Sequence, residues 1–397
     1  MKKNITAIKM ENVASLLLAV YIATLYTGTV FSYIQGLNLN LIFGVFMVFF
    51  VSVQFLSKSR PSVPKVDTFL FFLYVLCILP SVMMSQDIEQ STGNFLAFGA
   101  YWATLIFPLY FFRERINLIM HSSVIVGLAS ALYVLYKSFM ELETISRLQV
   151  IGDIDTNHLA FGLGVLVILT IRMVSYFRSR AVRSALFLAI MFMIFSVLLL
   201  MSRTAILGLS LGFILALLVN VIVKYRFDRK DFTKTLPIAF AVFFVPLFFL
   251  YYIFQDSFIY LGSRFSEARF YDVRLAWWSE SLLKINSWKD VLFGFGYFQT
   301  NPHNEYIRYF SNSGLFGAMW LSAFLVLVYL FKVWPTRSNM STFMFQNWLF
   351  FYMIIYLGTY GHVKTFWVAP AAIIMIFLSS SRKRSSQKIE IVGVNRK

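Results

Sequence analysis

The chain has 397 residues, of which 59% are hydrophobic and 19% aromatic, while only 13% are charged. A soluble fold of this length cannot bury so much apolar surface, so composition excludes a soluble enzyme, a disordered chain and a disulfide-rich secreted scaffold. The single Cys77 allows no intrachain disulfide. The net charge of +17 would point to nucleic acid in a soluble protein. Here the basic residues lie between apolar runs, which is typical of residues that set membrane orientation.

Long apolar runs follow one another along the chain. A spanning helix needs about 20 apolar residues, whereas the strands of a membrane barrel are about 10 residues long and alternate in character. The sequence therefore predicts an all-α, polytopic membrane bundle of about 12 transmembrane helices. We expect them near 13–31, 36–56, 67–84, 95–112, 118–137, 159–177, 184–201, 204–223, 236–254, 314–333, 345–362 and 365–380.

The run from Ser184 to Val223 contains one charged residue, Arg203. A single helix of about 40 residues would be about 60 Å long, twice the thickness of the hydrocarbon core. We therefore expect two helices with a turn at residues 201–204. This turn places Arg203 near a membrane face, where a charge is costly unless it finds a partner, a polar cavity or the lipid headgroups.

The predicted spans place both termini and most Lys and Arg residues on one side. That side carries the basic residues of the segments 2–9, 58–65, 113–115, 172–183, 224–234, 332–337 and 382–397. Basic loops stay in the cytoplasm, so we expect both termini there, with the first span retained as an anchor. The chain then divides into nine spans (1–254), a long outer loop (255–313), three spans (314–380) and a basic cytoplasmic tail (381–397).

The long outer loop carries Arg264, Arg269 and Arg274 at intervals of five residues. On one helix each would be rotated by about 140° from the last, so the three cannot form a single stripe. A guanidinium binds phosphate oxygens bidentately, which makes a phosphate clamp one interpretation. Ion pairing with Glu267 and Asp272, or contact with lipid headgroups, is the other.

Arg274 opens the stretch RLAWWSESLLK, in which Leu275, Trp278, Leu282 and Leu283 fall near one helical face. Tryptophan prefers the membrane interface, so we expect a short amphipathic helix on the outer leaflet. Such a helix would hold Arg274 at headgroup depth. Its simplest role is anchoring.

The segment Asn301-Pro302-His303-Asn304-Glu305 is expected to begin a helix, with Asn301 as the cap and Pro302 in the first position. His303 would then be the second helical residue, where the positive helix end favours a neutral imidazole. A neutral imidazole can act as a general base or donate to a phosphate. A histidine that only caps or packs is the alternative.

Two further motifs are weaker. Gly294-Phe295-Gly296 is expected to form a turn rather than a phosphate-binding loop. The Asp-x-Asp at Asp153 and Asp155 is expected to form a turn and cap the next span. No Walker motif, Ser-His-Asp spacing or Cys/His metal cluster is present. Ionisable residues gather in the outer loop rather than within the spans, which favours an enzyme at the outer surface over a carrier.

In order along the chain come Asn157, the Ser202-Arg203-Thr204 span start, Arg274 with Trp277 and Trp278, Gly294 with Gly296, His303 with Asn304, and Gly314-Leu315-Phe316-Gly317. This ordered set, together with the long loop between the ninth and tenth spans, resembles the superfamily of O-antigen ligases and O-antigen polymerases. The resemblance covers residues 150–320.

The resemblance implies a metal-independent, inverting glycosyltransferase of the GT-C type in the bacterial inner membrane, with its site facing the periplasm and no cofactor. The donor would be a glycan on undecaprenyl pyrophosphate. For a ligase, the acceptor would be the lipid A core. For an O-antigen, capsular or exopolysaccharide polymerase, it would be a second lipid-linked repeat unit. The loop lengths favour a ligase. Partners would be these lipids and the bilayer, without nucleic acid. A lipid-linked glycan transporter and a structural partner of a glycan assembly complex are alternatives from other classes.

The resemblance also assigns roles to individual residues. It transfers the family's catalytic positions to Arg203, Arg274 and His303. The residues expected to contact pyrophosphate or lipid are Arg264, Arg269, Trp277, Trp278, Asn304 and Arg308. Glu305 is the alternative base if His303 binds phosphate instead.

Overall fold

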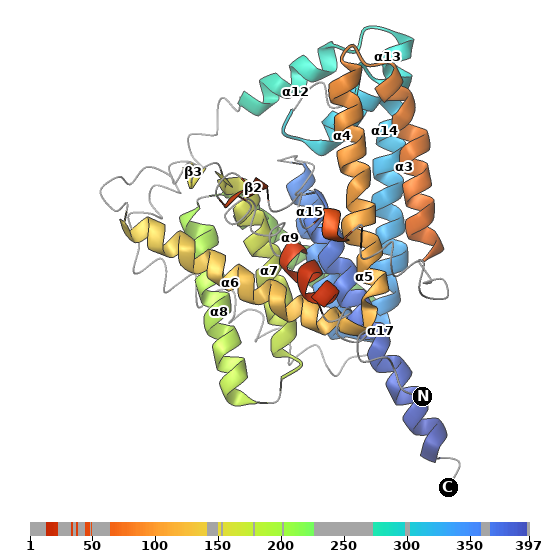
Figure 1. Ribbon diagram of the computed structural model, residues 1–397. Coiled ribbons are helices and arrows are strands. Elements are labelled where there is room, and N and C mark those ends of the chain that lie inside the picture. Colours follow the sequence, from red (N-terminus) through yellow and green to blue (C-terminus); the bar gives the residue numbers. More distant parts are fainter. Residues whose placement is uncertain are drawn as a thin grey trace.

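The computed structural model is a helical bundle with two short antiparallel strand pairs (Figure 1). It describes residues 13–22, 33–34, 37–38, 44–47, 49, 64–140, 150–151, 154–177, 179–200, 202–225, 273–297, 302–358 and 366–394. The strand pairs are β1 (Tyr33–Ile34) with β2 (Leu37–Asn38), and β3 (Val150–Ile151) with β4 (Ile154–Asp155). The prediction of an all-α architecture is confirmed at this level.

Within the described residues, seven helices are long and apolar enough to cross a membrane. They comprise α3 (Lys65–Met83), α4 (Ile88–Tyr101) with η1 (Trp102–Ile106) and α5 (Phe107–Phe111), and η2 (Arg113–Arg115) with α6 (Ile116–Met140). Then follow α7 (Thr156–Val174), α8 (Arg180–Leu199), α9 (Arg203–Tyr225), and α14 (Glu305–Val328) continued by η3 (Tyr329–Val333) and η4 (Trp334–Ser338). Two other helices, α15 (Met340–Leu357) and α17 (Val368–Val394), overlap the predicted spans at 345–362 and 365–380, and α17 continues beyond residue 380 into the predicted basic tail.

The described residues account for only part of the expected spans. Residues 13–22 of the first expected span form a short apolar helix. The expected span at 236–254, and most of the one at 36–56, lie outside the described residues. The expected turn between residues 184 and 223 is confirmed, since α8 ends at Leu199 and α9 begins at Arg203.

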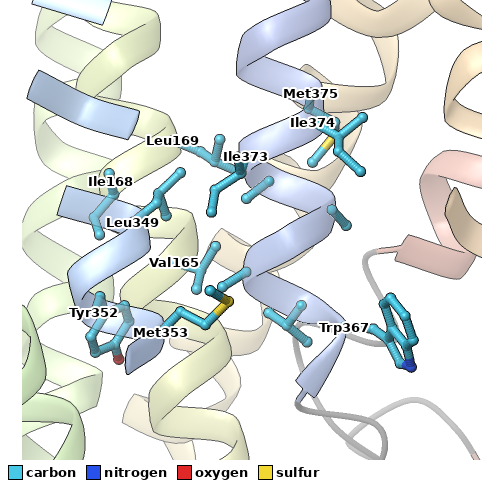
Figure 2. Close-up of a cluster of buried hydrophobic side chains, with 14 of the residues drawn as sticks. Val165, Ile168, Leu169, Leu349, Tyr352, Met353, Trp367, Ile373, Ile374 and Met375 are labelled. Carbon is cyan, nitrogen blue, oxygen red and sulfur yellow. The ribbon is translucent and has the colours of Figure 1, made fainter. Parts of the chain in front are cut away.

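α15 is the central helix of one half of the bundle and packs against α7, α9 and α17. Figure 2 shows its Leu349, Tyr352 and Met353 meeting apolar side chains of α7 and α17. Tyr352 is fully buried, and the added Cβ of an alanine at Gly164 or Gly208 would lie within 3 Å of its ring. Small residues at helix interfaces let helices approach closely, so these glycines create the space that Tyr352 fills.

Aromatic side chains fill the other half, between α3, α4, α14 and the start of α17. Trp102 and Trp367 meet edge to face with ring centroids 4.4 Å apart, and Trp320 contacts Phe98 at 5.5 Å. Such pairs add to the stability that burial alone provides. Among the described residues, this aromatic cluster joins α14 to α3, to α4 and to the start of α17.

Successive helices run in opposite directions, so the connections gather at two ends of the bundle (Figure 1). At one end Lys332 of η3 contacts Asp67 of α3, and Arg172 of α7 donates to Thr342 of α15. The basic residues of the connections η2 and α7–α8 lie at this end, which we call the basic end. At the opposite end lie the start of α14 and helices α12 (Val273–Leu283) and α13 (Trp288–Phe293).

A buried ion pair joins three helices near the basic end. The Lys332 ammonium lies 2.7 Å from the Asp67 carboxylate and donates to the Tyr110 hydroxyl at 2.5 Å. Both charged side chains are at most 6% exposed. They adjoin a small cavity lined by aromatic and aliphatic residues of η1, α14 and α17. Two π-helical segments, η1 and η3, contribute residues to the lining of this cavity.

We predict that Lys332→Met destabilises the bundle strongly, because it leaves the Asp67 carboxylate buried without its partner. Breaking a buried pair in this way costs about 3–5 kcal/mol. Thermal unfolding in detergent, followed by size-exclusion chromatography, measures the loss. The double variant Asp67→Leu/Lys332→Met should recover most of it, since apolar side chains of similar volume replace such pairs well. A double variant as unstable as Lys332→Met would contradict this account.

Candidate functional site

Four helix ends meet at the end of the bundle opposite the basic end. The Asn304 amide, before α14, donates to the Gly358 carbonyl, after α15, at 2.8 Å. The ring of Phe161, in the second turn of α7, stacks on Tyr356 near the end of α15 with centroids 3.7 Å apart. The α9 start joins this group through Ser202, whose hydroxyl donates to the Asn157 side-chain oxygen at 3.0 Å. We call this set of helix ends the outer cluster.

The Ser202–Asn157 hydrogen bond determines where Arg203 lies. Ser202 is fully buried and caps α9, since its carbonyl accepts from the Ile206 amide at 3.1 Å. Arg203 follows as the first residue of α9 and is half-buried. Two motifs that are 45 residues apart in the sequence thus touch each other, and Arg203 lies at the outer cluster rather than in the middle of a span, as predicted.

The predicted start of α14 is wrong by three residues. Asn304, not Asn301, is the cap, and its side-chain oxygen accepts from the Ile307 amide at 3.1 Å. His303 therefore precedes the helix and is not its second residue, so the electrostatic argument from that helical position does not apply. Asn304 is favoured over Asn301 as the cap because its side-chain amide also donates to the Gly358 carbonyl. This hydrogen bond links the beginning of α14 to the end of α15.

His303 has an uncommon backbone conformation. Its φ of 53° is positive, and no other non-glycine residue that the structure describes shares this feature. Histidine is one of the residue types that tolerate this region, and residues in it often mark functional sites. The imidazole is half-buried and faces the Trp277 ring of α12, with centroids 5.0 Å apart and planes inclined by 33°.

Helix α12 forms where the sequence predicts an amphipathic helix. The Trp278 indole N–H donates to the Pro302 carbonyl at 2.9 Å, so the helix is anchored directly before His303. Leu275, Leu282 and Leu283 are exposed, which is the arrangement expected of a helix with an apolar outer face. Arg274 is the second residue of α12. The predicted phosphate ligands Arg264 and Arg269 lie outside the described residues.

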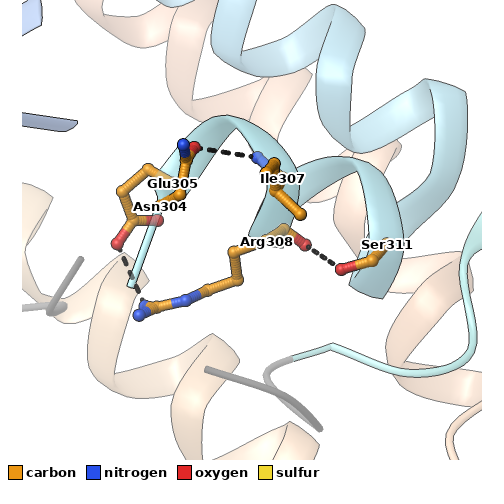
Figure 3. Close-up of polar contacts among 5 residues, drawn as sticks. All are labelled: Asn304, Glu305, Ile307, Arg308 and Ser311. Atoms are coloured by element: carbon orange, nitrogen blue, oxygen red, sulfur yellow. Dashed lines mark hydrogen bonds and ion pairs between the residues drawn. The ribbon is translucent and has the colours of Figure 1, made fainter. Parts of the chain in front are cut away.

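Arg308 and Glu305 form a buried ion pair on the first turn of α14 (Figure 3). The guanidinium lies 3.0 Å from the carboxylate, and the two side chains are 3% and 2% exposed. Arg308 was expected to contact lipid or pyrophosphate, and Glu305 was the alternative base. The structure places both side chains inside the bundle, where each compensates the charge of the other.

A layer of hydroxyl groups connects the outer loop to α3 and α4. Ser91 of α4 donates to the Tyr297 carbonyl at 2.8 Å, and the Tyr74 hydroxyl donates to the Tyr297 hydroxyl at 3.2 Å. Burial raises the pKa of Tyr297, so its phenol stays protonated. Sequence reasoning missed this layer because single serines and tyrosines in apolar helices give no distinct pattern.

The glycine motifs form a backbone joint. α14 is kinked at Gly314, with φ 62° and ψ −156°, a conformation essentially limited to glycine. The carbonyls of Ser311 and Asn312, next to the kink, accept from the amides of Phe295 and Gly296 at 3.2 Å each. Gly294 ends α13 at φ 71° and lies against the backbone of Asn312. The expected turn is confirmed, and its role is to join the outer loop to α14.

Comparison with known proteins identifies no relative: no protein-family model, no curated protein and no solved structure matches the chain. Among the described residues, no three His, Cys, Asp or Glu side chains lie close enough to share a metal ion. The outer cluster is therefore described by its own geometry. It brings together Asn157, Ser202, Arg203, His303 and Asn304, held by the end of α15.

We predict that Gly314→Ala disrupts this joint. The added Cβ would lie 2.3 Å from the Leu292 carbonyl carbon, and alanine would have to adopt φ 62°. A non-glycine residue in such a conformation costs about 1–3 kcal/mol, and the clash adds to this. Thermal unfolding in detergent should show a clear loss.

Gly93→Ala is the matched control, because no atom lies within 4 Å of its added Cβ in α4. Replacing an interior helix glycine by alanine stabilises by about 0.5–1 kcal/mol. Equal stability of the Gly314→Ala and Gly93→Ala variants would refute the joint.

Proposed function

We propose that the protein is a membrane glycosyltransferase of the O-antigen ligase type. It would transfer a glycan from undecaprenyl pyrophosphate to the sugar core of lipid A at the outer face of the bacterial inner membrane. One observation carries the proposal: motifs spread over residues 157–304 converge on the outer cluster, at the end of the bundle opposite the basic connections. Basic connections remain in the cytoplasm, so the outer cluster would lie on the opposite, periplasmic side of the membrane. Lipid-linked glycans are transferred on that side in the proposed reaction.

The chemistry asks for positive charge near the pyrophosphate. As the bond between sugar and phosphate oxygen breaks, negative charge grows on the leaving pyrophosphate, and groups that bind it more tightly in the transition state accelerate the reaction. Arg203 supports this role because it lies at the start of α9, with its backbone fixed by Ser202 and Asn157. Arg274 and the other loop arginines would supply further positive charge to the pyrophosphate.

His303 is suited to the other half of the reaction. The acceptor hydroxyl loses its proton as it attacks the anomeric carbon, and a positioned imidazole can accept that proton. The half-buried His303 precedes α14 at the outer cluster. Glu305 has its carboxylate engaged with Arg308 inside the bundle, which favours His303 over Glu305 as the base.

Deletion of the gene distinguishes the acceptors. For a ligase, we expect the lipid A core to remain bare while long lipid-linked polymer accumulates, as seen on gels of the surface glycolipid and of the undecaprenyl-linked pool. A core that carries single repeat units, without long chains, would identify a polymerase instead. A bare lipid A core, with the lipid-linked donor retained on the cytoplasmic face, would identify a transporter.

We predict that His303→Asn lowers the transfer rate by about 10²–10⁴, the usual contribution of a general base. Asparagine tolerates positive φ, so the backbone at this position should persist and the variant should keep its melting temperature. Purified protein, lipid-linked donor and lipid A core, with product followed on a gel, provide the assay. Wild-type turnover in a folded His303→Asn protein would eliminate the base assignment.

We predict that Arg203→Lys lowers transfer at least about tenfold, because an ammonium keeps the charge but loses the bidentate contact with phosphate. Arg183→Lys is the control, since Arg183 lies on α8 at the basic end and is exposed. It should retain full activity. Full activity of Arg203→Lys would rule out a bidentate contact between Arg203 and the pyrophosphate. Contact with lipid headgroups would then be the remaining role of Arg203.

A further inference from the structure

Three consecutive residues before α14 are each held by a different contact. The Pro302 carbonyl accepts from the Trp278 indole. The His303 ring faces the Trp277 ring. The Asn304 side chain caps α14 and binds Gly358. Pro302 and Asn304 are buried, and His303 between them is half-buried. Of these three residues, His303 is the one whose side chain can take up or release a proton near neutral pH. It is also the one whose neighbours on both sides are held by hydrogen bonds.

From this geometry we infer that Trp277 and Trp278 are positioning residues for His303, and not contacts for the substrate. Adjacent residues on a helix point about 100° apart, so one tryptophan reaches the carbonyl before His303 while its neighbour reaches the imidazole. One indole thus restrains the backbone and the other restrains the ring. The catalytic part of the inference rests on the proposed function, whereas the clamp itself does not.

The backbone conformation explains why such a clamp is needed. A non-glycine residue at φ 53° is disfavoured relative to the common regions, so this conformation persists only when its surroundings impose it. Asn304 fixes the residue after His303, and Trp278 fixes the carbonyl before it. Rotation of the His303 backbone to a relaxed conformation would break one of these two hydrogen bonds.

The contacts of the two indoles argue against a substrate platform. The N–H of Trp278 is already engaged, and its side chain is half-buried. Trp277 is 40% exposed, but its ring is turned toward the imidazole. By contrast, Trp288 of α13 is 83% exposed, so a tryptophan of the same loop provides a matched control.

Nuclear magnetic resonance tests the clamp without any activity. The chain has four histidines, so selective histidine labelling in nanodiscs gives few signals, and His303→Gln identifies the one from His303. An imidazole beside an indole shows a ring-current shift. In Trp277→Leu the His303 signal should move to the position of an unstacked imidazole, in Trp277→Phe it should move part of the way, and in Trp288→Phe it should not move.

Trp278→Phe tests the second contact, since it keeps an aromatic ring and removes the indole N–H. We expect the His303 signal to broaden or split, because the backbone is no longer held in one conformation. A His303 signal that is unchanged in both Trp277→Leu and Trp278→Phe, with melting temperatures like the wild type, overturns the clamp.

Transfer assays test whether the clamp serves catalysis. Trp277→Leu and Trp278→Phe should each lower kcat about five- to tenfold, which corresponds to about 1–1.4 kcal/mol. The KM for the lipid donor should stay within about twofold of the wild-type value. Trp277→Phe should restore most of kcat. A raised KM with unchanged kcat would mean that the tryptophans bind substrate and would overturn the inference. Normal spectral shifts with no transferase activity in the wild-type protein would instead reject the proposed function and leave the clamp standing.

Discussion

The kink at Gly314 is the point on which the outer part of the structure depends. Inside a bilayer every backbone N–H and C=O must find a partner within the protein, and a break in a helix leaves carbonyls without their usual donors. Here the carbonyl of Asn312 accepts from the Ser81 hydroxyl of α3 at 2.6 Å as well as from the Gly296 amide. One kink thus requires both α3 and the outer loop to lie against α14. The first turns of α14, with Asn304 and His303 before them, are positioned as a consequence.

A second constraint orders the other half of the outer cluster. α15 carries buried polar groups, and its Gln346 donates to the Ile373 carbonyl of α17 at 2.9 Å while the Trp348 indole donates to the Leu209 carbonyl of α9 at 2.9 Å. Hydrogen bonds between helices act together with close packing to associate spans in lipid, where there is no hydrophobic driving force between them. α15 is thereby held in a fixed register against α9 and α17. That register brings the end of α15 beside Asn304 and the start of α7.

The sequence was sufficient to predict features that depend on local hydrophobicity, such as the seven helices of spanning length among the described residues, the α8–α9 turn and the amphipathic α12. It was not sufficient at the start of α14, where Asn301 and Asn304 satisfy the same capping rule and a distant contact with Gly358 decides between them. The ion pair of Lys332 and Asp67 joins residues 265 positions apart, which no periodicity or spacing records. The glycine motifs were visible, but their joint requires knowledge of which backbone segments meet.

The two buried ion pairs bear on what kind of protein this is. Ionisable residues within membrane helices are often the mark of a carrier, and the sequence suggested that few were present. The structure contains Asp67 with Lys332, and Glu305 with Arg308, each pair within 3.0 Å and nearly inaccessible to solvent. A carrier needs such groups to exchange partners with its cargo, whereas here the first pair joins η3 to α3 and the second lies within the first turn of α14. Arg203 and His303 differ from them in being half-buried at a helix end, which is the position from which a side chain can meet a substrate arriving from the membrane surface.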